Sequence, residues 1–229
     1  MSFSEVEERA VTPLYPLFVR LEDARVVVVG GGVVAARKVE MLLECGAKLI
    51  VVAPEAVESI RVLAAEGRLT WWQRPYAHGD LEGALLAVAA TSEHAVNEAV
   101  LVEAAERTML VNSVDDSASC NCFVPATLQR GRLQVAVSTG GASPSAAREL
   151  RRELAEGIPG WWEPYLDLVM DVRTIVKERV PGPSRRRAFM LEQLGAPALR
   201  ERIASGERPT AEQVFQEIAE CGLDERGRQ

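Results

Sequence analysis

The sequence has little of what would place it in a specialised class of protein. Aromatic residues make up 5% of its 229 residues, and its four cysteines follow no disulfide framework. The longest apolar stretch, residues 26–36, contains three glycines and is too short to span a bilayer. No segment resembles a signal peptide. We therefore expect a soluble protein of the reducing cytoplasm, with no membrane partner.

Positive charge is also in short supply, and lysine in particular. Asp and Glu number 33 against 26 Lys and Arg, so the net charge is −7. This balance argues against a nucleic-acid partner, since nucleic-acid binders carry a basic excess. Only three of the basic residues are lysines. Arginine binds carboxylates through two parallel hydrogen bonds, so an anionic substrate stays open.

Ligands for a metal ion are sparse as well. The chain has two histidines, His78 and His94, and one Cys-x-Cys pair, Cys120 and Cys122. A structural zinc site needs four such ligands, usually as two spaced pairs. We therefore predict no metal site and interpret the cysteines as buried or loop residues.

Alternating strands and helices fill the first half of the chain. Residues 25–30 form a β-branched run that ends in glycine, typical of a strand buried on both faces of a parallel sheet. The pattern then predicts helices over 33–45, over 55–67 and from a cap at Ser92 to about 107, with strands at 48–53, 69–73, 85–90 and 109–111. Five strands with intervening helices predict an α/β fold with a Rossmann-type, doubly wound parallel sheet.

After residue 111 the pattern changes. Short strands are predicted at 123–125 and 133–139, and helices from Ser143 onward, over 161–180, 186–194 and 210–220. We predict three parts: an NAD-binding Rossmann domain over 1–113, a small strand-rich connector over 114–148 and a helical C-terminal domain over 149–229.

A glycine-rich loop follows the first predicted strand. Residues 30–35 fit the pattern G-x-G-x-x-[G/A], in which the first glycine allows a tight turn and the second lets the backbone approach a pyrophosphate. The start of the next helix favours phosphate. The predicted cofactor-binding residues of this loop are Gly30, Gly31, Gly32, Val33 and Val34. A plain strand-to-helix turn is the alternative.

The end of the second predicted strand bears on the choice of cofactor. The acidic residue expected about twenty residues after the glycine loop is replaced by Ala53 and Pro54, which leaves Glu55 as a displaced candidate for the ribose hydroxyls. This arrangement favours NAD over NADP.

Further motifs lie before and after the glycine loop. In order, they are Tyr15–Phe18, Val28–Lys38, Asn112–Asp116, Cys120-Asn121 and Val135–Pro144. Together they resemble the precorrin-2 dehydrogenase family, over about residues 14 to 155. That family includes single-chain enzymes and the N-terminal module of sirohaem synthase. Cys122 stands where an aromatic residue is usual, and Ser113 where an apolar one is common.

The resemblance implies a reaction, a cofactor and an assembly. The reaction is NAD-dependent oxidation of precorrin-2 to sirohydrochlorin, on the path to sirohaem. The assembly is a homodimer, held by the small connector region. Some members also insert iron, so a bifunctional enzyme stays open as an alternative. A non-catalytic, NAD-sensing Rossmann module is the other.

Asp115 is the predicted catalytic residue. It follows the last Rossmann strand, at the sheet edge where ligands bind, and a positioned general base would assist proton release from the macrocycle. An Asx turn or a helix cap is the alternative. Both histidines, His78 and His94, are expected to lie away from this loop. Ala90, Thr91 and Asn112 follow neighbouring strands and are predicted to bind cofactor, with local capping as the alternative.

Substrate carboxylates are predicted to bind at a second glycine turn. Its residues are Ser138, Thr139, Gly140 and Gly141, at a strand end just before a helix. Arg148 on that helix is the predicted cationic partner. An ordinary turn with Ser143 as N-cap and Pro144 at the first helical position is the alternative, and a solvated face is the alternative for Arg148.

Overall fold

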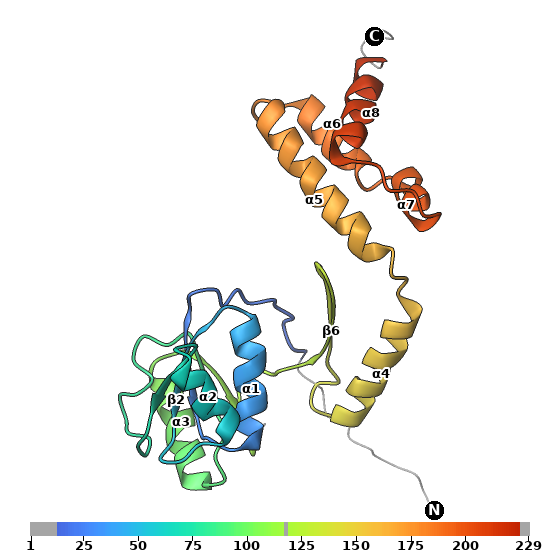
Figure 1. Cartoon of the computed structure of the whole chain (residues 1–229). Coiled ribbons are helices and arrows are strands. Elements are labelled where there is room, and N and C mark those ends of the chain that lie inside the picture. Colours follow the sequence, from blue (N-terminus) through green and yellow to red (C-terminus); the bar gives the residue numbers. More distant parts are fainter. Residues whose placement is uncertain (1–12, 117–118, 225–229) are drawn as a thin grey trace, which may run out of the picture. The chain divides into compact units, whose positions relative to one another are not determined.

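The computed structural model of the chain describes residues 13–116 and 119–224. The chain forms two compact units that divide between Val124 and Pro125. Figure 1 shows the helices and strands of both units. No helix within the described ranges is both long and apolar enough to cross a membrane.

The first unit is built on a five-stranded parallel sheet with strand order β3-β2-β1-β4-β5. The strands are β1 (Arg25–Val29), β2 (Lys48–Val52), β3 (Thr70–Trp72), β4 (Leu86–Ala89) and β5 (Leu110–Ser113). In β1 the four valines are buried, because helices cover both faces of the sheet. This order confirms the predicted doubly wound fold.

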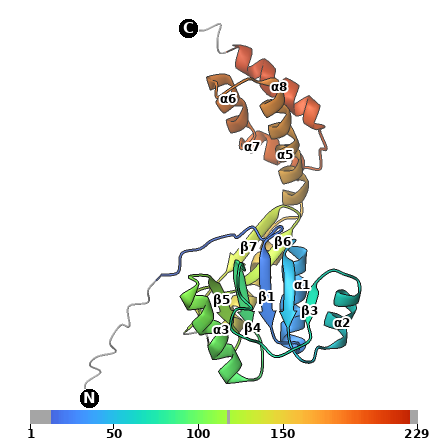
Figure 2. The same ribbon diagram turned by 90° about the vertical axis from the view of Figure 1, so that its left-hand side faces the viewer.

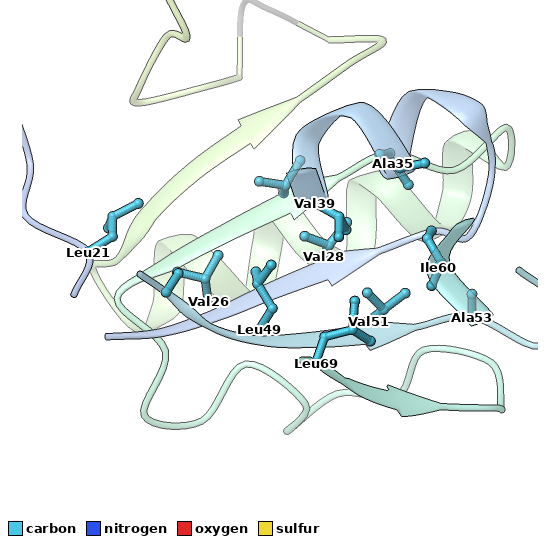
Figure 3. Close-up of a cluster of buried hydrophobic side chains, with 14 residues drawn as sticks. Leu21, Val26, Val28, Ala35, Val39, Leu49, Val51, Ala53, Ile60 and Leu69 are labelled. Carbon is cyan, nitrogen blue, oxygen red and sulfur yellow. The ribbon is translucent and has the colours of Figure 1, made fainter. Parts of the chain in front are cut away.

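Three helices cover the sheet: α1 (Val33–Glu44), α2 (Glu58–Ala65) and α3 (His94–Glu106). Alternate residues of β1 point to opposite faces. Val26 and Val28 pack with Ala35 and Val39 of α1 and Ile60 of α2 (Figure 3). The other face of the strand packs against α3, where Val100, Leu101 and Ala104 are buried. Figure 2 shows the sheet with β5, β4, β1 and β3 labelled in their order across it.

Two helices of this unit begin later than predicted. α2 starts at Glu58 rather than at residue 55, because Pro54 and the residues after it form a bend. α3 starts at His94, its N-cap is Glu93, and no side chain caps it, so the predicted Ser92 cap is wrong. The Thr91 hydroxyl accepts a hydrogen bond from the Glu93 N–H at 3.0 Å, just before the helix starts.

The second unit begins with an antiparallel hairpin of β6 (Ala126–Arg130) and β7 (Leu133–Val137). The strand predicted at 123–125 is wrong: β6 begins at Ala126, just after the predicted strand ends, since Pro125 has no N–H to donate to a ladder. Helix α4 (Pro144–Gly157) packs on the hairpin. The Arg130 guanidinium donates to the carbonyls of Ala155 and Ile158 at the end of α4.

Four further helices complete the second unit. They are α5 (Trp162–Arg179), α6 (Arg185–Gln193), α7 (Pro197–Ala204) and α8 (Ala211–Asp224). Their shared core includes Val172, Val176 and Met190, none of which is accessible to solvent, and the buried Tyr165 hydroxyl donates to the Leu194 carbonyl at 2.7 Å. Three of these helices are predicted from the sequence, but α7, which begins at Pro197, is not.

Candidate functional site

The candidate site lies at the edge of the sheet where the parallel strands end. β1, β4 and β5 are neighbours, with Val29 paired to Ala89 and Ala89 paired to Ser113. The residues that follow these strands therefore share one edge, and they include the glycine loop, Thr91 and Asp115. Ligands of doubly wound sheets bind at this edge.

The glycine loop needs glycine at two positions and leaves space at the third. Gly30 has a φ of +122°, and a Cβ there would lie 2.3 Å from the carbonyl oxygen of Ala90. A Cβ on Gly31 would lie 2.1 Å from the carbonyl oxygen of Glu55. At Gly32 an added Cβ would meet nothing within 4 Å, so the start of α1 is open.

This open helix start fits the pyrophosphate of a dinucleotide. Gly32 is the N-cap of α1, no side chain caps the helix, and its first turn holds no acidic residue. The first N–H groups of the helix therefore face outward without a side-chain acceptor, and Val33 and Val34 are exposed beside them. Gly32, Val33 and Val34 would hold the pyrophosphate of NAD, whose nicotinamide accepts a hydride when bound.

The residues after β2 lie beside the same loop. Ala53 is buried, and its carbonyl accepts a hydrogen bond from the Trp71 indole at 2.9 Å. Pro54 and Glu55 are exposed. The Glu55 side chain is therefore accessible to a ribose. Its role in binding one stays a prediction.

Asp115 is held by three side chains. The Ser113 hydroxyl donates to its Oδ1 at 2.5 Å, and the Asn97 amide donates to its Oδ2 at 2.8 Å. His94 Nδ1 also lies 3.2 Å from Oδ2. The hydrogen bond from Ser113, and then those from Asn97 and His94, hold the pKa of Asp115 well below its usual range. The carboxylate is therefore ionised at any physiological pH.

Asn97 connects this carboxylate to the end of β4. Its Oδ1 accepts from the Thr91 N–H at 3.2 Å and from the Thr91 hydroxyl at 3.0 Å, and its Nδ2 donates to the Thr91 carbonyl at 3.1 Å. Asn97 is itself buried on the first turns of α3. The side chain of Thr91 is thus used locally, as the capping alternative predicts, whereas binding of cofactor by Thr91 stays a prediction.

His94 is the residue whose predicted position is wrong. It is expected from the sequence to lie away from the Asp115 loop, but the two side chains form an ion pair at 3.2 Å when the imidazole is protonated. The hydrogen bond and the charge of Asp115 raise the pKa of His94, and Glu98 and Asp116 add to the effect. His94 and Asn97 are three residues apart at the start of α3, so both reach the loop after β5.

Residues 120–122 run along the open edge of β5. Asn121 accepts from the Val111 N–H at 2.8 Å and donates to the Met109 carbonyl at 2.7 Å, which satisfies the strand edge. Cys120 Sγ accepts from the Ser113 N–H at 2.9 Å. Asn112 is buried and donates to the Cys122 carbonyl at 3.1 Å, so its side chain acts in this packing.

Cys120 and Cys122 of this segment are free thiols. Burial raises the pKa of Cys122 to about 11, so its thiol stays protonated at neutral pH. Across residues 13–116 and 119–224, no group of three or more His, Cys, Asp or Glu is placed to hold a metal ion.

The second predicted turn lies in the second unit, after β7. Gly140 and Gly141 have φ values of +61° and +86°, and Ser138 Oγ accepts from the Gly140 N–H at 3.2 Å. Thr139 is used locally, because its hydroxyl bonds both the N–H and the carbonyl of the helix cap. That cap is Ser143, which accepts from the Ala146 N–H at 3.1 Å, so the predicted capping is confirmed. Capping leaves anion binding at the turn untested.

Comparisons with known proteins agree with this geometry. Residues 17–126 match the NAD(P)-binding family, and residues 130–156 match the central domain of sirohaem biosynthesis proteins. Siroheme synthases of Xylella fastidiosa and Chromobacterium violaceum are 39% and 38% identical, each over 93% of this chain and 45% of their own. The solved structure of SirC, a precorrin-2 dehydrogenase, covers 90% of this chain and 100% of its own, at 26% identity and a TM-score of 0.74.

This chain belongs to the precorrin-2 dehydrogenase and siroheme synthase family. It spans about half the length of the curated siroheme synthases it matches. The first matched segment ends two residues past the division after Val124, and the second lies wholly in the second unit.

In this member of the family, the predicted residues at the edge of the first unit's sheet lie together. The structure places Asp115, Thr91 and the glycine loop along one edge of the first unit. It adds Asn97 and His94, which the sequence-based prediction misses. The signal was available: a polar pair spaced by three residues opens the helix that follows β4, next to the strand that leads to Asp115. Arg148 is exposed on α4 and makes no ion pair with another described residue.

Proposed function

We propose that this chain is an NAD-dependent precorrin-2 dehydrogenase that forms sirohydrochlorin. One observation carries the proposal: an ionised, solvent-accessible carboxylate, Asp115, shares a sheet edge with a glycine cradle built for a pyrophosphate. The likeness to the dehydrogenase SirC and the family to which the chain belongs support the choice of substrate.

The reaction asks two things of the protein. The cofactor supplies the hydride acceptor when it is bound, so the chain has to orient the substrate and assist the release of a proton. Asp115 is the carboxylate on which that proton release depends. Its side chain is 32% exposed, so a substrate can approach it, while three donors fix its position.

Binding of the substrate is proposed for the second unit. Precorrin-2 carries eight carboxylates, and Arg148 together with the turn of Ser138, Thr139, Gly140 and Gly141 offers a guanidinium and backbone donors. Arg148 is exposed and its charge is not neutralised by a described neighbour, which leaves it able to pair with a substrate. The homodimer, the cytoplasmic location and the additional insertion of iron stay predictions.

The test is anaerobic formation of NADH from precorrin-2, compared between the wild type, Asp115→Asn and Asp116→Asn. We expect turnover by the wild type, a loss of about 10²-fold or more for Asp115→Asn, and a change of at most a few fold for Asp116→Asn. NAD binding should survive in both variants, since the glycine cradle is unchanged. A folded wild type that binds NAD without turnover would favour the NAD-sensing alternative instead.

A further inference from the structure

The pairing of His94 with Asp115 leaves one ring nitrogen of His94 open. Nδ1 lies 3.2 Å from Asp115 Oδ2, whereas Nε2 has no hydrogen-bond partner among the described residues. The His94 side chain is 74% exposed, so a substrate can reach Nε2. The geometry is that of an imidazole oriented from behind by a carboxylate.

The state of Asp115 fixes the tautomer of the neutral imidazole. An ionised carboxylate only accepts hydrogen bonds, so the ring nitrogen that faces it has to carry a hydrogen. Neutral His94 therefore has its proton on Nδ1 and a lone pair on Nε2. The buried Asn97 and the Ser113 hydroxyl hold the carboxylate from other sides, so it cannot turn away from the imidazole without losing both bonds.

The same contacts make Asp115 a poor proton acceptor. A carboxylate whose charge is stabilised by three donors has a pKa far below neutral, and general bases work best with a pKa near the working pH. A histidine beside a carboxylate lies much closer to that optimum. His94 is therefore a better proton acceptor than Asp115, which keeps its negative charge.

We propose that His94 Nε2 accepts the proton released when the substrate is oxidised, and that Asp115 orients the imidazole and stabilises its charged form. The inference rests on the proposed dehydrogenase function. Oxidation removes two hydrogens from the macrocycle: one leaves with its electron pair as the hydride that NAD accepts. The other goes to Nε2 as a proton, and the electron pair of its bond enters the new double bond.

The charges around His94 favour this role. Asp115 and Asp116 face it from the loop after β5, and Glu98 faces it from the next turn of α3. All three are acidic, so they stabilise an imidazolium. The start of α3 opposes them, because a helix N-terminus disfavours a positive charge. The net direction is upward, which places the titration of His94 above its ordinary 6.5.

The chain offers a matched control, because it contains only two histidines. His78 is also exposed and also pairs with a carboxylate, Glu106 at 2.9 Å. The experiment compares wild type, His94→Asn and His78→Asn in NADH formation from precorrin-2 as a function of pH. Asparagine keeps an N–H for Asp115 but cannot accept the proton. The two variants also assign the two histidine signals in a proton NMR titration without substrate.

We expect His94→Asn to lower kcat by about tenfold to 10³-fold with NAD affinity unchanged, and His78→Asn to stay within a few fold of wild type. The wild-type kcat/KM should decrease at low pH, as His94 becomes protonated, with a pKa above the ordinary 6.5 of histidine. This acidic limb of the pH profile should vanish in His94→Asn. In the NMR titration, Asp115→Asn should lower the pKa of His94 and leave that of His78 unchanged.

Two results would overturn the inference. One is a His94→Asn variant that turns over like wild type with the same pH profile, which would return the base role to Asp115 or to water. The other is an NMR titration in which Asp115→Asn leaves the pKa of His94 unchanged. Failure of the proposed function looks different, since the wild type itself would then not oxidise precorrin-2.

Discussion

Substitution of the buried Glu103 should destabilise the first unit strongly. Glu103 on α3 is inaccessible to solvent and accepts four hydrogen bonds. Its donors are the Tyr76 hydroxyl at 2.5 Å, the N–H groups of Gly79 and Leu81 at 2.9 and 3.3 Å, and Arg107 Nε at 2.7 Å. These bonds tie the loop between β3 and β4 to α3.

The cost of Glu103→Gln follows from counting donors. Glutamine keeps one oxygen but replaces the other with an NH₂ group, so two of the four donors lose their acceptor and face a donor instead. An unsatisfied buried donor costs about 1–3 kcal/mol, which gives roughly 2–6 kcal/mol for the pair. The change also removes the charge that Arg107 meets, so the cost should lie in the upper part of this range.

Hydrogen exchange of backbone amides is the sharpest assay, because a two-unit chain need not unfold in one step. A loss of about 4 kcal/mol corresponds to roughly 10³-fold faster exchange, which we expect at the amides of Gly79 and Leu81. Glu106→Gln is the control: Glu106 lies on the same helix, but its side chain is 56% exposed and pairs with the exposed His78. That variant should change stability by at most about 0.5 kcal/mol. Equal effects of the two substitutions would refute the donor count.

The contribution of Glu103 should also depend on pH. Burial alone raises the pKa of a carboxyl, but hydrogen bonds from Tyr76, Gly79, Arg107 and Leu81 outweigh it and hold the pKa of Glu103 below its ordinary 4.5. A carboxyl group whose pKa is lowered by folding stabilises the protein at pH values above its pKa in the unfolded chain. This stabilisation is lost as the pH falls through the pKa of the group in the folded protein. The stability gap between wild type and Glu103→Gln should therefore narrow below about pH 4.5.

Three further substitutions test the site and the second unit. Gly31→Ala should destabilise the first unit, since its Cβ would lie 2.1 Å from the Glu55 carbonyl oxygen, and thermal unfolding would show this. Gly32→Ala should fold normally, because an added Cβ there meets nothing within 4 Å, but it should weaken NAD binding in a titration. Ser113→Ala should raise the pKa of Asp115, because the Ser113 hydroxyl is the main cause of its lowering, and carbon NMR of the carboxyl would show it. Tyr165→Phe should cost about 1–2 kcal/mol in denaturant unfolding by leaving the buried Leu194 carbonyl without its donor; an unchanged midpoint would contradict this.

The architecture of the first unit was predictable because its signals are redundant. A valine run buried on both faces, a helix with apolar residues on one side and a second apolar strand all indicate the same βαβ unit. Element ends were less predictable, since they depend on single contacts. The expected cap at Ser92 is wrong because the helix starts one residue later, with Glu93 at the N-cap position and no side-chain cap.

The candidate site was predictable only in part, for a related reason. The glycine loop and Asp115 lie next to strands in the sequence, so their place at the sheet edge follows from topology. The contact of His94 with Asp115 joins residues 21 positions apart, through the register of α3 on β4 and β5. Helical spacing shows that His94 and Asn97 share a side of α3, but not which loop that side faces. Helix α7 was missed because Gly195 and Pro197 signal a loop, whereas a proline at the first helical position is equally a start.

Glu103 and Asp115 are both held by hydrogen bonds within the first unit, but they differ in how exposed they are to solvent, and this difference indicates different roles. Glu103 and Asp115 are each held ionised by several donors, and both are linked to α3. Glu103 is inaccessible, and its donors come from the loop between β3 and β4 and from Arg107 at the end of α3, so it serves the fold alone. Asp115 is one-third exposed, and one of its partners, His94, turns an open nitrogen to solvent. A fixed charge with a titratable neighbour at the ligand-binding edge is what a proton-releasing oxidation requires, and a buried charge cannot provide it.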